Sequence, residues 1–316
     1  MARIRRRDIA RLAFGGFATR HRPLLTHLVV TRYCNLDCAY CNEFDKVSKP
    51  VPLEELRARI DRLAELGNVI VTLTGGEPLT HPEHAAIIAH IRKRGMVATS
   101  ITNGFLLTRP IIEAMNEAGL QGLQISIDGV RPDEVSKKTL KSLAGKLELL
   151  SKHAKFPVNI NSVLGMSEER TAEAIDVRDA ALKLGFSHTI GVMHEGDGTL
   201  VPLSDTQRAV YEKAVEEGGL AHRFNRWLFQ QNLVENRPND WHCRAGARYL
   251  YICEDGLVHY CSQRRGDPGI PLTDYGREDI SREYQTRKSC APFCTVSCVQ
   301  QISAFDRWRG ASGPVV

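Results

Sequence analysis

Nine cysteines are the residues of this chain whose type and spacing point most directly to chemistry. Cys34, Cys38 and Cys41 lie together in the stretch CNLDCAYC, and the next cysteine follows only at position 243. The chain begins without the apolar stretch of a secretion signal, so we expect a cytoplasmic protein whose thiols stay reduced. Clustered cysteines in such a protein indicate metal binding rather than disulfides. The remaining six are Cys243, Cys253, Cys261, Cys290, Cys294 and Cys298.

The first cysteine group has an open position in its coordination. Three thiolates from one tight loop can bind three irons of a [4Fe–4S] cluster and leave the fourth iron free for a small molecule. Structural zinc sites usually have four ligands, so a zinc ion completed by a remote residue is the alternative for this loop.

The elements that must position these residues alternate along the chain. Short runs rich in Val, Ile and Thr are separated by amphipathic helical patterns, as in PLEELRARIDRLAELG, which ends at Gly67. In LTRPIIEAMNEAGL, Thr108 is a predicted N-cap and Gly119 a predicted stop. Repeated strand–helix units indicate a parallel sheet. The predicted strands are 26–33, 69–76, 96–104, 122–129, 156–165 and 187–196.

Polar or glycine residues follow every one of these runs. In a barrel all such strand ends face one mouth, whereas a doubly wound sheet gathers ligands only where the strand order reverses. We therefore predict an α/β fold, a partial (β/α)6 TIM-like barrel. His194 and Glu195 follow the sixth strand and are candidate catalytic residues that contact the substrate or relay a proton. A polar loop without a chemical role is the alternative for that segment.

The spacing Cys-x3-Cys-x-aromatic-Cys resembles the signature of the radical S-adenosylmethionine (SAM) superfamily. GGEP at 75–78 resembles the family's second-strand motif, and NSVLGMSE at 161–168 resembles its fifth-strand pattern, with Asn161 in place of the first glycine. The resemblance covers about residues 26–196. It implies a [4Fe–4S] cluster on the first three cysteines whose unique iron binds SAM. Reductive cleavage of SAM, with a flavodoxin- or ferredoxin-type electron donor, would yield a 5′-deoxyadenosyl radical that takes hydrogen from a substrate.

The same resemblance implies the residues that contact SAM. The aromatic residue before the last cysteine would lie beside adenine, the GGEP backbone would meet the methionyl amino group, and the fourth strand would end at the ribose and carboxylate contacts. Transferred onto this chain, the implied cofactor contacts are Tyr40, Gly75, Gly76, Glu77, Pro78, Asn103, Ser126, Asp128, Val163, Gly165 and Glu168.

The second cysteine group resembles the SPASM and twitch extensions of radical SAM enzymes, which bind auxiliary [4Fe–4S] clusters. This resemblance rests on the spacing Cys243-x12-Gly256-x4-Cys261 and on a predicted hairpin at EDGLVHY. The full SPASM pattern has more cysteines than the three that follow here. We predict one auxiliary cluster on Cys243, Cys253, Cys261 and one of the last trio, with Cys298 preferred. Cys290 and Cys294 would then serve a second, incompletely ligated cluster, or one of them a proton or hydrogen-atom transfer; a structural zinc ion is the main alternative.

Four segments follow from these patterns: a basic N-terminal segment 1–24, a barrel core 25–200, a helical connection 201–240 and a cysteine-rich module 241–316. The last segment shows little periodicity, so we expect metal coordination to supply much of its folding free energy. His242 and His259 are expected to be ordinary polar residues there. The Lys-rich stretch 137–146 is predicted to be a solvated helix face.

The sequence says less about the binding partners of the protein than about its chemistry. A net charge of +5 with 37 acidic residues does not favour nucleic-acid binding, and no apolar run is long enough to span a membrane. Seven arginines in residues 1–22 predict a basic amphipathic helix that packs on its own domain or contacts the inner membrane surface.

The sequence does not identify the substrate, and small molecules, lipids and peptides all remain candidate classes. The layout is similar to hopanoid-type radical SAM enzymes. Peptide-modifying relatives often carry a leader-binding domain, for which the 33 residues before Cys34 are too few. Outside enzymes, the alternative is a non-catalytic Fe–S or zinc protein that carries electrons or serves as a scaffold, which would have no need of GGEP.

Overall fold

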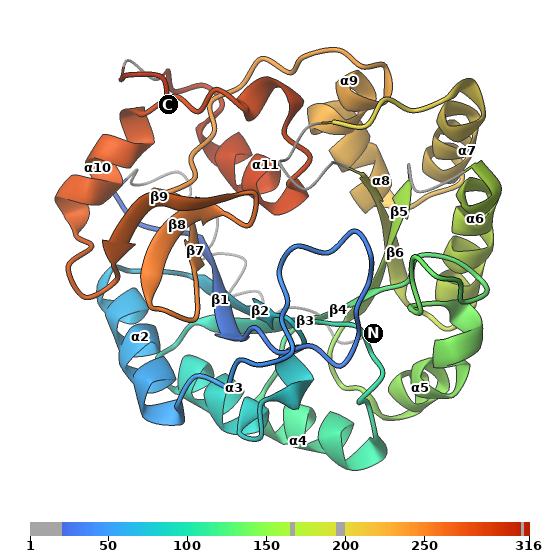
Figure 1. Cartoon of the computed structure of the whole chain (residues 1–316), viewed down its shortest axis with the longest axis horizontal. Coiled ribbons are helices and arrows are strands. Elements are labelled where there is room, and N and C mark those ends of the chain that lie inside the picture. Colours follow the sequence, from blue (N-terminus) through green and yellow to red (C-terminus); the bar gives the residue numbers. More distant parts are fainter. Residues whose placement is uncertain (1–20, 165–167, 194–199, 311–312) are drawn as a thin grey trace.

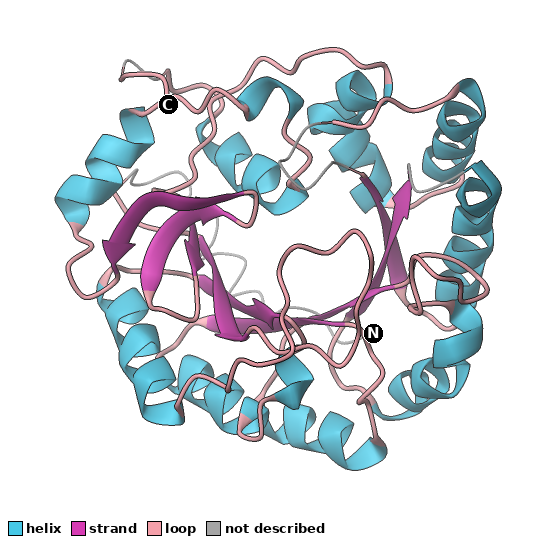
Figure 2. Cartoon of the chain, in the orientation of Figure 1, coloured by secondary structure: helices cyan, strands magenta, loops and turns pink. Residues whose placement is uncertain are grey.

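One curved sheet organises the molecule. The computed structural model describes residues 21–164, 168–193, 200–310 and 313–316. Nine strands run in the order β6-β5-β4-β3-β2-β1-β7-β8-β9 (Figure 1). The strands curve along the inside of an arc of helices (Figure 2).

Six parallel strands confirm the predicted partial (β/α)6 barrel. Each predicted run contains one strand, and the ends shift by only a few residues. The strands are β1 Leu25–Thr31, β2 Ile70–Gly75, β3 Val97–Thr102, β4 Leu123–Ser126, β5 Val158–Leu164 and β6 Ser187–Val192.

Helices follow the strands where the periodicity predicts them. The side chain of Thr108 accepts a hydrogen bond from the Ile111 amide at the start of α4, and the helix ends at Gly119, whose φ of +85° favours glycine. Ser204 begins α7 with a capping box. The helices of this part are α2 Leu53–Glu65, α3 His84–Lys93, α4 Arg109–Ala118, α5 Leu140–His153, α6 Glu168–Lys183, α7 Asp205–Glu216, α8 Leu220–Asn225, η2 Arg226–Gln230 and α9 Gln231–Val234, and η1 is the short turn Pro78–Thr80.

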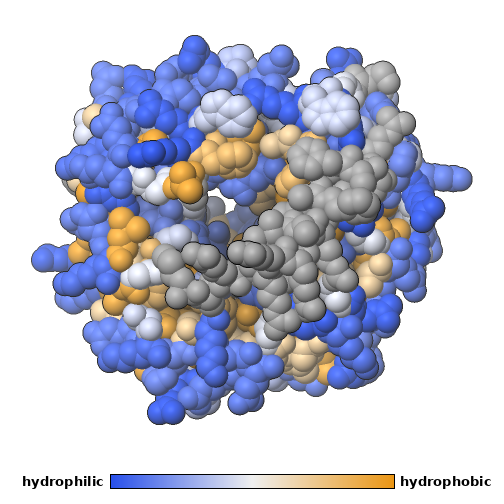
Figure 3. Space-filling view, turned by 180° about the vertical axis from the view of Figure 1, so that it is seen from behind, coloured by the Kyte–Doolittle hydropathy of each residue, from blue (hydrophilic) through white to orange (hydrophobic). Residues whose placement is uncertain are grey.

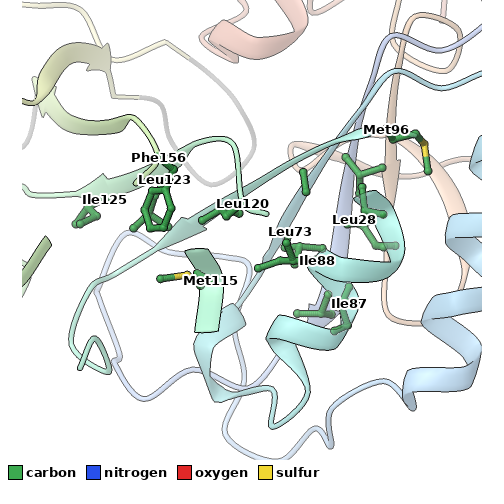
Figure 4. Packing of buried hydrophobic residues seen from close by; sticks show 14 of the residues in the cluster. Leu28, Leu73, Ile87, Ile88, Met96, Met115, Leu120, Leu123, Ile125 and Phe156 are labelled. Atoms are coloured by element: carbon green, nitrogen blue, oxygen red, sulfur yellow. The ribbon is translucent and has the colours of Figure 1, made fainter. Parts of the chain in front are cut away.

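The main core lies between the sheet and its helices. Leu28 and Leu73 from β1 and β2 pack against Ile87 and Ile88 of α3, and all four are fully buried (Figure 4). Burial of such side chains contributes roughly 1.5–3 kcal/mol each. This core fixes the strand ends, on which the cysteine loop and its neighbours are mounted.

The cysteine-rich module continues the same sheet. β7 Tyr249–Ile252 pairs in parallel with β1, and β8 Leu257–Cys261 and β9 Arg264–Pro271 follow as antiparallel strands. The predicted hairpin is therefore present, formed by β7 and β8. The remaining elements are α10 Arg277–Gln285, η3 Ala291–Phe293, α11 Ser297–Ser303 and η4 Ala304–Asp306.

A second apolar cluster joins this module to the barrel. Leu24 and Leu25 at the start of β1 pack with Tyr249, Val299 and Ile302. Hydrophobic burial thus contributes to the folding of the module besides any metal. Within the described ranges, no helix is both long enough and apolar enough to cross a membrane. The basic stretch 1–20 lies outside the described residues.

Candidate active site

The first three cysteines occupy the loop that follows β1. Cys34 and Cys38 are buried and Cys41 is half-buried. The Cys34 sulfur accepts hydrogen bonds from the Leu36 amide at 3.4 Å and from Nδ2 of Asn103 at 3.7 Å. The ammonium of Lys46 donates to the carbonyl oxygens of Cys34 and Leu36 at 3.0 and 2.8 Å. The loop is therefore held by its own neighbours before any metal binds.

The thiols of this loop fit a cationic metal group. Burial raises the pKa of Cys34 and of Cys41, so their thiolates need a nearby positive charge to form at neutral pH. Donors already aimed at the Cys34 sulfur are typical of thiolates that hold iron–sulfur clusters.

The spacing of the loop thiols differs from that of a single-ion site. Thiolates about 2.3 Å from one zinc ion in a tetrahedron would lie roughly 3.8 Å apart. Of the residues described, only Cys253, Asp255 and His259 bring three ligand atoms within 4.8 Å of one another. Nδ1 of His259 accepts a hydrogen bond from the Gly266 amide at 2.9 Å, so Nε2 of the neutral ring carries the proton and has no lone pair for a metal.

The GGEP turn holds the cysteine loop through its backbone. A Cβ on Gly75 would lie 2.0 Å from the Thr31 carbonyl oxygen, and one on Gly76 would lie 2.3 Å from that of Arg32. The amides of Gly76 and Glu77 donate to the carbonyl oxygens of Thr31 and Tyr33, both at 2.9 Å. Glycine is thus required here because β2 must approach the backbone that leads to Cys34.

Glu77 points into the barrel wall. Its carboxylate accepts hydrogen bonds from the Thr102 hydroxyl at 2.6 Å, the Asn103 amide at 2.7 Å and the Leu79 amide at 3.0 Å. Its side chain is fully buried, and this burial raises the pKa of Glu77. Pro78 is buried directly behind it in η1. The carboxylate thereby joins the end of β2 to Asn103, which contacts the cysteine loop.

A buried charged group lies where β4 ends. The Tyr40 hydroxyl donates to Oδ2 of Asp128 at 2.5 Å, and the Lys138 ammonium donates to the Tyr40 oxygen and pairs with Asp128 at 3.3 Å. Ser136 donates to the same carboxylate oxygen at 2.6 Å. Burial disfavours the ammonium, but the charges of Asp128 and Tyr40 outweigh it, so the pKa of Lys138 lies above its usual value.

Oδ1 of Asp128 is a buried acceptor that the described residues leave without a hydrogen bond. The Asp128 side chain is completely buried, yet this oxygen has no hydrogen-bond partner within the described part of the chain. A buried acceptor without a partner costs about 1–3 kcal/mol. A ligand hydroxyl that donated a hydrogen bond to Oδ1 would remove this cost. This fits the ribose contact implied by the resemblance.

The other implied cofactor contacts are distributed along the same edge. Ser126 ends β4, Val163 lies in β5 on the wall of the central cavity, and Glu168 begins α6 with an exposed side chain. Gly165, His194 and Glu195 lie outside the described residues, so their roles stay predictions.

A cavity of about 590 Å³ occupies the barrel interior. Seen from behind, the molecule is hollowed at its centre (Figure 3). Tyr40 lies on its wall, as do Thr295 and Cys298 from the C-terminal module. The described lining contains no Asp, Glu, Lys or Arg. Its one histidine, His27, is half-buried, and loss of hydration lowers its pKa to about 4, which keeps it neutral at pH 7.

Four of the six C-terminal cysteines form one group. Burial raises the pKa of Cys294 well above its usual value, and the next influences are the thiolates of Cys243, Cys261 and Cys290. Cys290 and Cys243 act in the same sense on Cys261, whose pKa burial raises to about 12. Cys290 also acts on Cys243. Four thiols whose charges act on one another suit one [4Fe–4S] cluster, although Cys290 is exposed and Cys294 half-buried.

The remaining two cysteines have different surroundings. Burial raises the pKa of Cys253 to about 12, and the charges that act on it next are the acids Glu254 and Asp255. Cys253 belongs to the same apolar cluster as Cys243 and Cys261, and Cys298 packs against that cluster. The set of cysteines that would hold the auxiliary cluster therefore stays a prediction.

Two lysines near the first cysteine loop are functional candidates that the sequence did not reveal. The expectation that residues 137–146 form a solvated helix face was wrong for Lys138, whose side chain is only 12% exposed. Lys46 clamps the loop backbone. Lysine in a polar stretch is usually solvated, and only the partners supplied by Tyr40 and Asp128 distinguish Lys138.

Comparisons with known proteins indicate a single superfamily. Residues 28–195 match the Radical SAM superfamily. A PqqA peptide cyclase of Gluconobacter oxydans (strain 621H) is 34% identical over 265 residues, 76% of this chain and 70% of that protein. An AdoMet-dependent heme synthase of Methanosarcina barkeri is 33% identical over 177 residues, 53% of this chain, and the match spans only half of that relative's length.

The fold is also similar to that of solved structures. Streptococcus suis SuiB, solved with its precursor peptide SuiA, superposes with a TM-score of 0.63 at 15% identity, over 93% of this chain and 74% of that one. At this identity the likeness is one of fold. The likeness in fold includes the antiparallel hairpin region after the barrel, which is similar to that of SPASM enzymes.

Proposed function

This chain belongs to the radical SAM superfamily, and we propose that it modifies an uncharged polar segment of a peptide inside the barrel cavity. SAM would bind at the carboxyl ends of β1 to β5, with its cluster on Cys34, Cys38 and Cys41. When bound, the cluster and SAM supply a 5′-deoxyadenosyl radical that removes hydrogen from carbon. Asp128 would receive a ribose hydroxyl at Oδ1, and Tyr40 would border the nucleoside.

The neutrality of the cavity carries this proposal. The hydroxyl and amide groups on its wall pair with one another, as Thr72 with Thr99 at 2.7 Å and Asn159 with Thr189 at 2.8 Å. Such groups match peptide amides and hydroxyl side chains. A substrate with several carboxylates would require cations, which the described lining lacks. The volume lies within the range of ordinary ligand pockets and admits a few residues of a peptide.

The auxiliary cluster would be held by Cys243, Cys261, Cys290 and Cys294. It would lie behind the cavity wall that Thr295 and Cys298 form, because these residues follow Cys294 directly in the chain. From there it could exchange an electron with a bound substrate or with a ferredoxin- or flavodoxin-type donor.

Cleavage of SAM tests the chemistry. Anaerobic protein with reconstituted clusters, SAM and dithionite should yield 5′-deoxyadenosine, and the Cys34/Cys38/Cys41→Ala triple variant should yield none. Iron, sulfide and zinc are measured on the same samples. Zinc in place of iron, or equal 5′-deoxyadenosine from both proteins, would contradict the proposal.

The substrate class needs its own experiment. A synthetic library of uncharged peptides rich in Ser, Thr, Asn and Gln is added to the SAM assay, beside a library in which Asp and Glu replace them. Stimulation of 5′-deoxyadenosine formation by the uncharged library, with a mass change in a peptide, supports the assignment. Stimulation by the acidic library alone contradicts it.

A lipid substrate at a membrane surface is the second candidate, because one helical face is apolar and exposed. Leu220, Phe224 and Trp227 share a face of α8 and η2 and are 84%, 45% and 70% exposed. Arg307 stacks on Trp227 at 5.5 Å. Aromatic and basic side chains together are typical of interfacial binding.

Binding to phospholipid vesicles tests the proposal of a lipid substrate. The full chain should co-sediment with vesicles of anionic phospholipid, and the Leu220→Ser/Trp227→Ser variant should not. Leu182→Ser, which changes an exposed leucine on α6, is the matched control. Equal sedimentation of all three proteins removes the reason to invoke a lipid.

A further inference from the structure

The segment that follows the first three cysteines is bound to the cysteine-rich module. Tyr251 on β7 donates a hydrogen bond from its hydroxyl to Oε1 of Glu43 at 2.5 Å. Arg265 on β9 donates from Nη2 to the carbonyl oxygen of Asn42 at 2.6 Å. Both accepting residues follow Cys41 within two positions. Two strands of the module therefore hold the end of the loop that would bind the first cluster.

The start of the same loop also contacts the module. Nε of Arg32 lies 3.6 Å from the carboxylate of Glu254, in the turn between β7 and β8. The backbone carbonyl of Arg32 accepts the Asp45 amide at 2.9 Å, and the carbonyl of Asp45 accepts the Cys34 amide at 3.2 Å. The two ends of the loop are thus joined to each other, and each is joined to the module.

The sheet itself places the Tyr251 hydroxyl. β7 pairs in parallel with β1, next to it in the sheet (Figure 1), and Tyr251 lies opposite His27 in the register. Directly paired residues of neighbouring strands face the same side of a sheet, so Tyr251 faces inward with His27, which lines the cavity. The side chain of Tyr251 is 2% exposed. A hydroxyl that donates to a carboxylate makes one of the stronger hydrogen bonds in proteins.

We propose that Tyr251 is a positioning residue: through Glu43 it lets the cysteine-rich module set the place of the cysteine loop, and with it the affinity for SAM. Binding sites of this kind require their ligands to be held within about 0.5 Å of the productive geometry. Loss of a partner that orients metal ligands from behind typically costs about 10–100-fold in metal affinity or activity. The inference rests on the proposed function, because it presupposes that SAM binds at the first cysteine loop.

SAM binding to full-length variants measures the contribution of the hydroxyl. The proteins are reconstituted anaerobically, and equilibrium dialysis gives the dissociation constant for SAM. We expect Tyr251→Phe to raise this constant about tenfold, and Glu43→Leu to raise it to a similar extent. The double variant Tyr251→Phe/Glu43→Leu should show no further rise, because both changes remove the same contact. Multiplication of the two effects in the double variant would show that the residues act separately and would overturn the proposal.

Two further variants separate positioning from general stability. Glu43→Gln keeps an oxygen that accepts the Tyr251 hydroxyl, so it should bind SAM nearly as tightly as the parent. Tyr260→Phe is the matched control, because the Tyr260 hydroxyl donates to the Glu283 carboxylate at 2.7 Å within the module. Urea denaturation should show lower stability for Tyr260→Phe and for Tyr251→Phe, but only Tyr251→Phe should weaken SAM binding. Equal weakening in both would indicate general loosening of the module and contradict the proposal.

Hydrogen–deuterium exchange locates the effect without any measurement of activity. The amides of Cys34 and Asp45 close the cysteine loop through backbone hydrogen bonds. Peptides that contain these amides should exchange several-fold faster in reconstituted Tyr251→Phe than in the parent, because local opening becomes easier. They should keep the parental rate in Tyr260→Phe. Unchanged exchange of the loop in Tyr251→Phe would show that the hydroxyl does not hold it.

Failure of this inference and failure of the proposed function give different results. If the parent and Tyr251→Phe bind SAM equally tightly, the positioning role is wrong and the proposed function stands. If the reconstituted parent itself binds no SAM, the proposed function is wrong, and the role of Tyr251 falls with it.

Discussion

At the scale of single residues, the site depends on charges that are buried and paired. Tyr40 comes from the loop after β1, whereas Asp128 and Lys138 both come from the connection between β4 and α5, and their contacts leave Oδ1 of Asp128 without a partner among the described residues. Breaking a buried ion pair by removal of one partner usually costs about 3–5 kcal/mol, because the other charge remains buried.

Lys138→Met should therefore weaken SAM binding. Without the ammonium, the buried Asp128 side chain loses its ion-pair partner, so the acceptor for the ribose is no longer held in place. We expect the dissociation constant for SAM to rise about tenfold or more, which corresponds to about 1.4 kcal/mol. Anaerobic equilibrium dialysis with the reconstituted enzyme measures it. Lys141→Met, at an exposed position on the same segment, is the control, and an unchanged constant in Lys138→Met would show that the lysine does not position the acid.

Glu77 makes a second prediction at this scale. In Glu77→Gln an NH2 group replaces one oxygen and must face either the donors of Thr102 and Leu79, which share one oxygen, or the Asn103 amide, which donates to the other. The free energy of unfolding should fall by about 1–3 kcal/mol, the cost of leaving a buried donor unsatisfied. Urea denaturation of the full chain measures it. Glu83→Gln, an exposed acid a few residues away, should leave the stability unchanged. Equal stabilities of the two variants would count against the role of Glu77 in joining β2 to β3.

At the scale of elements, local signals were predictable and long-range pairing was not. Thr108 and Gly119 bound α4 because a cap and a left-handed glycine act within a few residues. The pairing of β7 with β1 depends on Tyr249 and Leu25, more than two hundred residues apart, and no local pattern in the short run YLYI reveals it. The set of cysteines for the auxiliary cluster is of the same kind, because spacing alone allows several sets.

The contact between α3 and β3 predicts a dependence of stability on pH. Nε2 of His84 lies 3.1 Å from the Ser100 hydroxyl, and burial lowers the pKa of His84 to about 4 from 6.5. The unfolded chain binds a proton below pH 6.5 that the folded chain does not bind until about pH 4. Stability is therefore full above pH 6.5 and falls by up to about 3 kcal/mol as the pH decreases to 4.

Two variants separate titration of His84 from loss of its hydrogen bond. His84→Gln should flatten the decline between pH 6.5 and 4.5, measured by urea denaturation at a series of pH values. Ser100→Ala should lower the stability by a similar amount at every pH and keep the decline, since the imidazole stays buried. Parallel curves for His84→Gln and the parent would show that other groups, such as His27 and His188, dominate the acid response.

At the scale of the whole molecule, the C-terminal residues are bound to the start of the sheet. Arg248, just before β7, pairs with Asp306 of η4 at 2.7 Å, and both side chains are completely inaccessible. The backbone carbonyl of Arg248 accepts the Leu24 amide at 2.8 Å, next to β1. The barrel and the cysteine-rich module thus share one sheet, one apolar cluster and one buried ion pair, so they should unfold together.

The Arg248→Met variant tests whether the barrel and the cysteine-rich module unfold together. The change leaves the buried Asp306 carboxylate with Arg309, at 2.6 Å, as its remaining ion-pair partner, so the free energy of unfolding should fall by up to about 3 kcal/mol. Arg248→Met/Asp306→Leu should recover part of this loss, because the buried carboxylate is then absent. The transition is followed by far-UV circular dichroism and, in the same samples, by the visible absorbance of the clusters. Both signals should shift together in each variant. If the absorbance of the clusters were lost well before the helical signal in Arg248→Met, the module would unfold independently and the ion pair would not link it to the barrel.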